Sequence, residues 1–151
     1  METTLSSQEN HRYLREKAGY FFLKDLCLIS AEGSDLFSYL QTQTTNDVNE
    51  LKPGQGQNNA IVDRKARVIS TFSLHRTGEE SAVILVETQQ KENLLDHLNS
   101  FLFREDVTLT LSNHFVLALQ GPKSQEIIKN FTRSDDSIPE KPNDICRFTF
   151  E

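Results

Sequence analysis

Three cations cluster in one short turn of an acidic chain. Arg64, Lys65 and Arg67 follow one another closely, whereas the 151 residues as a whole carry 16 basic and 22 acidic side chains, for a net charge of -6. Because a guanidinium group can hold a carboxylate or phosphate with two parallel hydrogen bonds, the cluster predicts a docking point for an anionic ligand. The alternative is a hairpin tip whose charges are simply solvated.

Two further groups of polar side chains interrupt apolar stretches. Thr44, Thr45, Asn46 and Asp47 follow a short amphipathic segment. They can form a polar wall of a binding cleft, or they can cap a helix and make a turn. The pair Ser70–Thr71 breaks an apolar strand, and one of its hydroxyl groups must face the buried side. A buried hydroxyl needs a hydrogen-bond partner, and the expected partner is a neighbouring backbone carbonyl.

Other kinds of chemistry have little support in the sequence. Cys27 lies in an apolar string and Cys146 is far from it, which indicates free thiols in a reducing, cytoplasmic compartment. The cysteines and the four histidines show no metal-ligand spacing. The stretch 54–56 has two glycines but is too short for a phosphate-binding loop. The negative net charge disfavours nucleic acid, and no apolar run approaches the ~20 residues of a membrane span.

The elements that position these residues follow from the spacing of apolar side chains. Alternating or continuous apolar runs predict strands, and apolar residues at helical spacing predict helices. The predicted strands are 20–29, 59–63, 67–75, 82–86, 107–111 and 115–119, and the predicted helices follow Ser34 as N-cap, run over 90–103 and begin at Gly121-Pro122. This order predicts the α+β class, with helices packed on a mixed or antiparallel sheet.

The predicted domain organisation has four parts. Residues 1–19 form a polar N-terminal arm, 20–131 form the α+β domain, 132–144 form a linker or loop, and 145–151 form a terminal strand. A strand at the very end needs a partner. The 36% hydrophobic residues together with the 6 glycines make about 40% of the chain, below the ~45–50% that is usual for a soluble domain. We therefore expect the terminal strand to continue into a region that this chain lacks.

Four segments together resemble the N-terminal part of the folate-binding superfamily of YgfZ and the glycine-cleavage T-protein, an aminomethyltransferase. They lie at 33–41, 45–56, 61–68 and 119–124, and include Thr45-Asn46-Asp47-Val48, Pro53-Gly54-Gln55-Gly56 and Gln120-Gly121-Pro122. The resemblance covers residues 23–131. It implies a folate-binding-type domain that continues into further domains, with tetrahydrofolate in a central channel to which both halves contribute.

One strand separates the two branches of this superfamily. T-proteins have Gly-Gly-Ile-hydrophobic-Asp-Asp there, with an aspartate facing the folate, and the ungapped alignment places Ser70 and Thr71 at the two acids. A hydroxyl group stays neutral at physiological pH and cannot replace a carboxylate. The turn Asp63-x-Lys65-x-Arg67 is closer to the YgfZ-like branch, although Ala66 stands where glycine is usual. The Lys-Gly-Cys motif of that branch would lie beyond the end of this chain.

The resemblance therefore favours a tetrahydrofolate-binding domain of a YgfZ-like protein, and this domain is expected to be non-catalytic on its own. Proteins of the YgfZ-like branch support iron–sulfur cluster assembly or repair. The residues expected to contact the ligand are Asn46, Asp47, Gln57, Arg64, Arg67 and Ser70. In this interpretation Asn46 and Asp47 make polar contacts, Gln57 and Ser70 line the channel, and the two arginines pair with the glutamate tail. The expected partners are a folate-type small molecule, iron–sulfur maturation proteins and the missing C-terminal domains.

Two alternatives stay open. The chain can be a fragment of a T-protein-like aminomethyltransferase whose acid comes from another position, with Asp63 as the nearest candidate. It can also be a structural module whose surface contacts its absent C-terminal partner.

Overall fold

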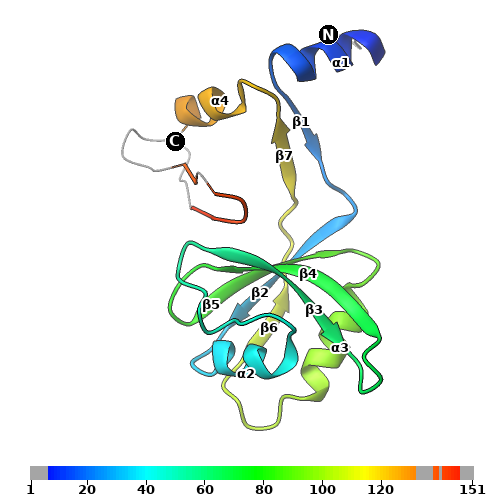
Figure 1. The fold of residues 1–151 in the computed structure, drawn as a ribbon, viewed down its shortest axis with the longest axis vertical. Helices are drawn as coiled ribbons and strands as arrows, with labels where there is room; N and C mark the ends of the chain where they lie inside the picture. The colour runs from blue at the N-terminus through cyan, green and yellow to red at the C-terminus, as the bar shows by residue number, and fades with distance from the viewer. Residues whose placement is uncertain (1–6, 132–137, 140, 147–151) are drawn as a thin grey trace. The chain divides into compact units, whose positions relative to one another are not determined.

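The computed structural model describes residues 7–131, 138–139 and 141–146, which divide into two compact units. Unit 1 contains α1 (Ser7–Glu16), β1 (Gly19–Phe22), β7 (Leu117–Gln120) and α4 (Ser124–Phe131). Unit 2 contains β2 (Leu26–Glu32), α2 (Leu36–Gln43), β3 (Gly56–Val62), β4 (Val68–Arg76), β5 (Ser81–Glu87), α3 (Lys91–Ser100), β6 (Thr108–Leu111) and residues 141–146 (Figure 1).

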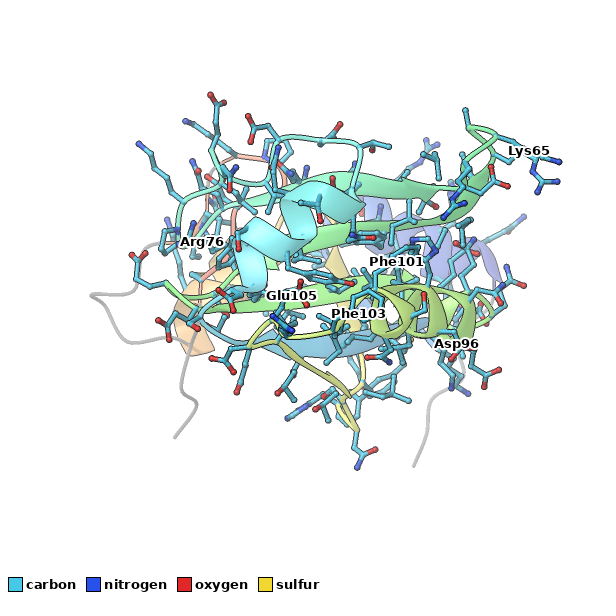
Figure 2. The ribbon with its side chains drawn as sticks, turned by 90° about the horizontal axis from the view of Figure 1, so that it is seen from below. Lys65, Arg76, Asp96, Phe101, Phe103 and Glu105 are labelled. Carbon is cyan, nitrogen blue, oxygen red and sulfur yellow. The ribbon has the colours of Figure 1, made fainter. Side chains whose placement is uncertain are left out.

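Unit 2 is built on one five-stranded sheet with the order β3-β4-β5-β2-β6. Every strand pair that the structure describes is antiparallel. Helices α2 and α3 lie on the same face of the sheet (Figures 1 and 2). The predicted α+β class with helices packed on an antiparallel sheet is therefore confirmed.

The core of unit 2 lies between the sheet and these two helices. Strand β4 shows how the sequence forms it, because Ser70, Phe72 and Leu74 are buried while Thr71 between them is exposed. This alternation follows from the two-residue period of a strand. From α2 and α3 the core takes Leu36, Tyr39, Leu40, Leu94 and Leu98, all buried.

The starts and ends of the helices differ from the sequence prediction. Ser34 is not the N-cap of α2; that position is Asp35, which makes no side-chain cap hydrogen bond. The Ser34 hydroxyl instead donates to Asp106 Oδ2 at 2.9 Å. Gly33 has a φ of 143°, and a Cβ there would overlap the Asp106 carbonyl, so the helix start is held by a distant loop. Helix α3 ends at Ser100, three residues earlier than predicted.

The predicted strand over 20–29 is two strands that belong to different sheets. In unit 1, β1 pairs with β7, from Gly19 opposite Gln120 to Phe22 opposite Leu117. In unit 2, β2 pairs with β5 and β6. The predicted polar arm holds α1, and residues 1–6 lie outside the described residues.

The predicted linker and terminal strand lie largely outside the described residues, at 132–137, 140 and 147–151. Within the part that is described, the Ile145 N–H donates to the Gly54 carbonyl at 2.7 Å. No helix among the described residues is long and apolar enough to cross a bilayer.

Candidate functional site

A cavity of about 550 Å³ lies in unit 2, against β2, β3, β4 and β5. Its walls include Asn58, Thr71, Ser73 and Leu85. These residues alternate along their strands with core residues, so their side chains point to the sheet face away from α2 and α3. The size falls in the range of about 300–1,000 Å³ that is typical of small-molecule sites.

The loop after α2 forms one wall of this cavity. The Thr45 N–H donates to the Ala60 carbonyl at 3.1 Å, and the Ala60 N–H donates to Thr45 Oγ1 at 3.2 Å. Asn46 Nδ2 donates to the Asn58 carbonyl at 2.6 Å. These bonds fix the loop along β3, and both Thr45 and Asn46 line the cavity. The polar stretch at 44–47 therefore makes a turn and also borders a hollow.

Ser70 does not face the cavity. Its side chain is 1% exposed, and its hydroxyl donates to Gln90 Oε1 at 3.0 Å, so the expected backbone carbonyl is not its partner. The Thr71 N–H donates to the same Gln90 oxygen at 3.1 Å. Thr71 is the member of the pair that lines the cavity. As a ligand contact Ser70 stays a prediction, and its observed role is to hold Gln90.

Gln57 and Asn59 alternate with the cavity-facing Asn58 along β3. Asn59 Oδ1 accepts a hydrogen bond from the Asn46 N–H at 3.3 Å. Gln57 Nε2 and Asn59 Nδ2 are buried and have no hydrogen-bond partner among the described residues. A buried donor that stays unpaired costs about 1–3 kcal/mol, so the two amides are a weak point of polar packing in β3.

The acids predicted from the sequence serve local turns. Asp63 Oδ1 accepts hydrogen bonds from the N–H groups of Lys65 at 2.8 Å and Arg67 at 3.0 Å. Asp63 Oδ2 pairs with the Arg67 guanidinium at 2.6 Å, and these bonds from Arg67 lower the pKa of Asp63. Asp47 Oδ1 accepts a hydrogen bond from the Asn49 N–H at 3.0 Å. Asp63 thus holds the hairpin turn, and the ion pair already engages Arg67.

Arg64 lies at a second hollow of about 570 Å³, which Thr45, His97 and Phe101 also line. Thr45 borders both hollows, so the two are neighbours along the loop after α2. Lys65 projects from the hairpin tip, away from the sheet (Figure 2). Of the six predicted ligand contacts, Asn46 lines the first cavity and Arg64 lines the second.

Apart from Asn46, the residues that line the cavity are not among the predicted ligand contacts, and Thr71 and Glu87 are the two that matter most for its chemistry. The sequence singles out Thr71 only as one of the pair Ser70–Thr71. Glu87 is the charged residue among those described around the cavity, and it directly follows the apolar run 82–86. A charged side chain at the end of a buried strand was an available signal. Among the described residues there is no group of three or more His, Cys, Asp or Glu side chains that could hold a metal ion.

Comparisons with known proteins agree on one family. A model described as the GCVT N-terminal domain matches residues 2–144. Proteins named aminomethyltransferase are 28% identical over 131 residues in Bacillus cytotoxicus, 30% over 139 residues in Oceanobacillus iheyensis and 29% over 139 residues in Thermus thermophilus. The matches cover 86%, 89% and 91% of this chain, but 36%, 37% and 40% of those proteins.

The fold has a counterpart among solved structures. The crystal structure of the glycine cleavage system aminomethyltransferase T from Bartonella henselae matches with a TM-score of 0.74 and 22% identity. The match covers 81% of this chain and 34% of that one. At this identity the likeness shows a shared fold. The chain therefore spans somewhat more than a third of the length of the relatives that it matches.

Proposed function

Because the chain belongs to the family of GCVT N-terminal domains, we propose that it is the folate-binding part of an aminomethyltransferase-type protein, with tetrahydrofolate as its ligand. The observation that carries this proposal is the cavity on the open face of the sheet. Asn46, Asn58, Thr71 and Ser73 give it hydrogen-bonding side chains, and Leu26 and Leu85 give it apolar surface. A planar heterocycle with N–H and carbonyl groups on its rim requires this combination.

The choice of branch differs from the one that the sequence favoured. Nothing in the comparisons points to the YgfZ-like branch or to iron–sulfur protein maturation, whereas the reported relatives are named aminomethyltransferase. We therefore adopt the alternative and propose that the chain contributes to transfer of a one-carbon unit to tetrahydrofolate. Since the chain spans 36–40% of the lengths of those relatives, the remaining catalytic groups would come from further polypeptide.

The basic hairpin supports one orientation of the bound ligand. A folate carries an anionic glutamate tail, and Arg64 lines the hollow next to the cavity. Arg67 already pairs with Asp63 at 2.6 Å, so the contact proposed for the tail is assigned to Arg64. The heterocycle would then occupy the cavity and the tail would pass Thr45 toward the hairpin.

The surface of unit 1 supports a further polypeptide partner. Its two strands expose large apolar side chains, with Tyr20 69% and Leu117 50% exposed. Apolar clusters of this sort are usually covered by another polypeptide. We propose that the remaining part of an aminomethyltransferase-length protein covers this ribbon.

Titration calorimetry with folinic acid, a stable reduced folate, tests the proposed ligand. We expect saturable binding by the chain and a loss of at least tenfold in affinity for Thr71→Tyr, because the larger ring fills the cavity. The matched control is Thr110→Tyr, an exposed threonine on β6 that does not line the cavity. The absence of saturable heat at millimolar ligand, or equal losses in both variants, contradicts the proposal.

A further inference from the structure

Glu87 places a carboxylate at the cavity. It is the last residue of β5 and stands opposite Leu26 of β2. Its neighbour Val86 is 1% exposed and pairs with Phe72 in the core, so Glu87 points to the other face together with Leu85. Strands β2, β4 and β5 contribute residues to the cavity, as does β3, and Glu87 is the charged residue among those described.

A network of amides orients this carboxylate. Gln89 Nε2 donates to Glu87 Oε2 at 2.8 Å, and Gln90 Nε2 donates to the same oxygen at 3.4 Å. Gln90 is itself held through its Oε1, which accepts hydrogen bonds from the buried Ser70 hydroxyl and the Thr71 N–H. Both side-chain bonds that the described residues make to Glu87 go to Oε2. The other oxygen, Oε1, is therefore free to accept a hydrogen bond from a ligand.

The other acids near this region are engaged in turns. Asp63 binds two backbone N–H groups and the Arg67 guanidinium, and Asp47 binds the Asn49 N–H. Neither residue lines the cavity. An acid that acts on a ligand in this cavity must therefore come from another position, and Glu87 is the one that the fold places there.

From this arrangement we infer that Glu87 is the acid group of the site: its carboxylate accepts a hydrogen bond from an N–H of the bound heterocycle and fixes which end of the ligand enters. The inference rests on the proposed function. A charge-assisted hydrogen bond is about twice as strong as a neutral one. The same negative charge repels an anionic tail, so it directs the tail toward Arg64 and away from the end of β5.

The test compares variants of Glu87 by titration calorimetry with folinic acid and with tetrahydropterin, which lacks the glutamate tail. Removing a hydrogen bond to a charged group costs roughly tenfold or more in affinity, so Glu87→Gln should weaken both ligands by at least about that factor. Glu87→Asp, which keeps the carboxylate, should lose less. The matched control is Glu32→Gln, at the end of β2 far from Leu26. Arg64→Gln should weaken folinic acid but not tetrahydropterin.

The outcomes separate the two proposals. If the unchanged chain binds neither ligand, the proposed function is overturned. If it binds folinic acid but Glu87→Gln stays within twofold of it for both ligands, the role of Glu87 is overturned while the folate site stands. Thermal unfolding of each variant shows whether a loss of binding comes from a loss of fold. If Glu87→Gln lowers the Tm, the affinity of Glu87→Asp is compared with that of Glu32→Gln. A lower affinity of Glu87→Asp supports the role of Glu87, and equal affinities overturn it.

Discussion

In the hairpin between β3 and β4, one residue has a strained backbone angle. Ala66 has a φ of 58°, in the left-handed region where a Cβ clashes with the following carbonyl. The Ala66 N–H donates to the Asp63 carbonyl at 2.9 Å, so the turn is closed in spite of this strain. In the superfamily that the sequence resembles, glycine is usual at this place, and the observed angle gives a physical reason for such a preference because glycine has no Cβ.

We predict that Ala66→Gly stabilises unit 2. Relief of the left-handed strain is worth about 1–2 kcal/mol, and the added freedom of glycine in the unfolded chain returns about 0.5–1 kcal/mol. The expected net gain is up to about 1.5 kcal/mol in the free energy of unfolding, measured by urea denaturation. Lys65→Gly is the control, because Lys65 lacks the positive φ and should only lose stability. Equal effects of the two substitutions would contradict the strain at Ala66.

The pair Ser70–Thr71 shows what the sequence can and cannot predict about the site. The alternation along 67–75 predicts that Val68, Ser70, Phe72 and Leu74 share one face. The structure buries Ser70, Phe72 and Leu74, but Val68 at the start of β4 is 62% exposed. Which face carries the cavity depends on where α2 and α3 pack, and this is a long-range property. The sequence therefore identified the two hydroxyls but assigned the ligand contact to the buried one. Gln90, the partner of Ser70, lies 20 residues further along the chain.

At the scale of elements, His75 joins β4 to the segment 141–146. Its Nδ1 lies 3.3 Å from the Asn143 carbonyl, and its Nε2 lies 3.1 Å from Ser73 Oγ. Burial lowers the pKa of His75 below its ordinary value of 6.5. The unfolded chain therefore binds a proton more readily than the folded chain. Stability from this residue is present above pH 6.5 and is lost as the pH falls below it.

We predict that the free energy of unfolding decreases between about pH 7.5 and about pH 5.5, and that His75→Gln makes this decrease smaller. The glutamine does not titrate, so the variant lacks the proton uptake that favours the unfolded chain. Urea denaturation at a series of pH values measures both slopes. Identical slopes for the variant and the unchanged chain would show that His75 does not contribute to the pH dependence.

The elements themselves were predictable where their pattern is local. The strand 67–75 and the helix starting at 90 follow from periodicity within one segment. The segment 20–29 could not be resolved in this way, because β1 pairs with β7 nearly a hundred residues later while β2 pairs with β5 and β6. The wrong N-cap prediction at Ser34 has the same cause, because Asp106, which accepts the hydrogen bond of the Ser34 hydroxyl, is 72 residues away. Distant partners override local preference at these places.

At the scale of the whole molecule, the division into two units has a consequence for folding. The buried hydrophobic core runs from Ile29 to Leu98, and every residue of it belongs to unit 2. We predict that a shortened chain of residues 24–116 folds on its own and unfolds cooperatively. It should be less stable than unit 2 in the whole chain, because it lacks the contacts of 141–146 with Gly54 and His75.

Circular dichroism and thermal unfolding of this shortened chain provide the measurement. Leu74→Ala in the same chain is the control, because removing a fully buried leucine costs about 2–5 kcal/mol and should lower the Tm clearly. A spectrum typical of a disordered chain for residues 24–116 would mean that unit 1 is required for unit 2 to fold.

The loop after α2 also has a protective effect. Strand β3 is at the margin of the five-stranded sheet, where a row of outward N–H and carbonyl groups would otherwise attract a strand of another molecule. Thr45 forms hydrogen bonds with the N–H and the carbonyl of Ala60, and Asn46 donates to the carbonyl of Asn58. The loop thus takes the place of a sixth strand without offering a regular ladder of its own. At this margin the residues that border the cavity also prevent edge-to-edge aggregation between copies of the chain.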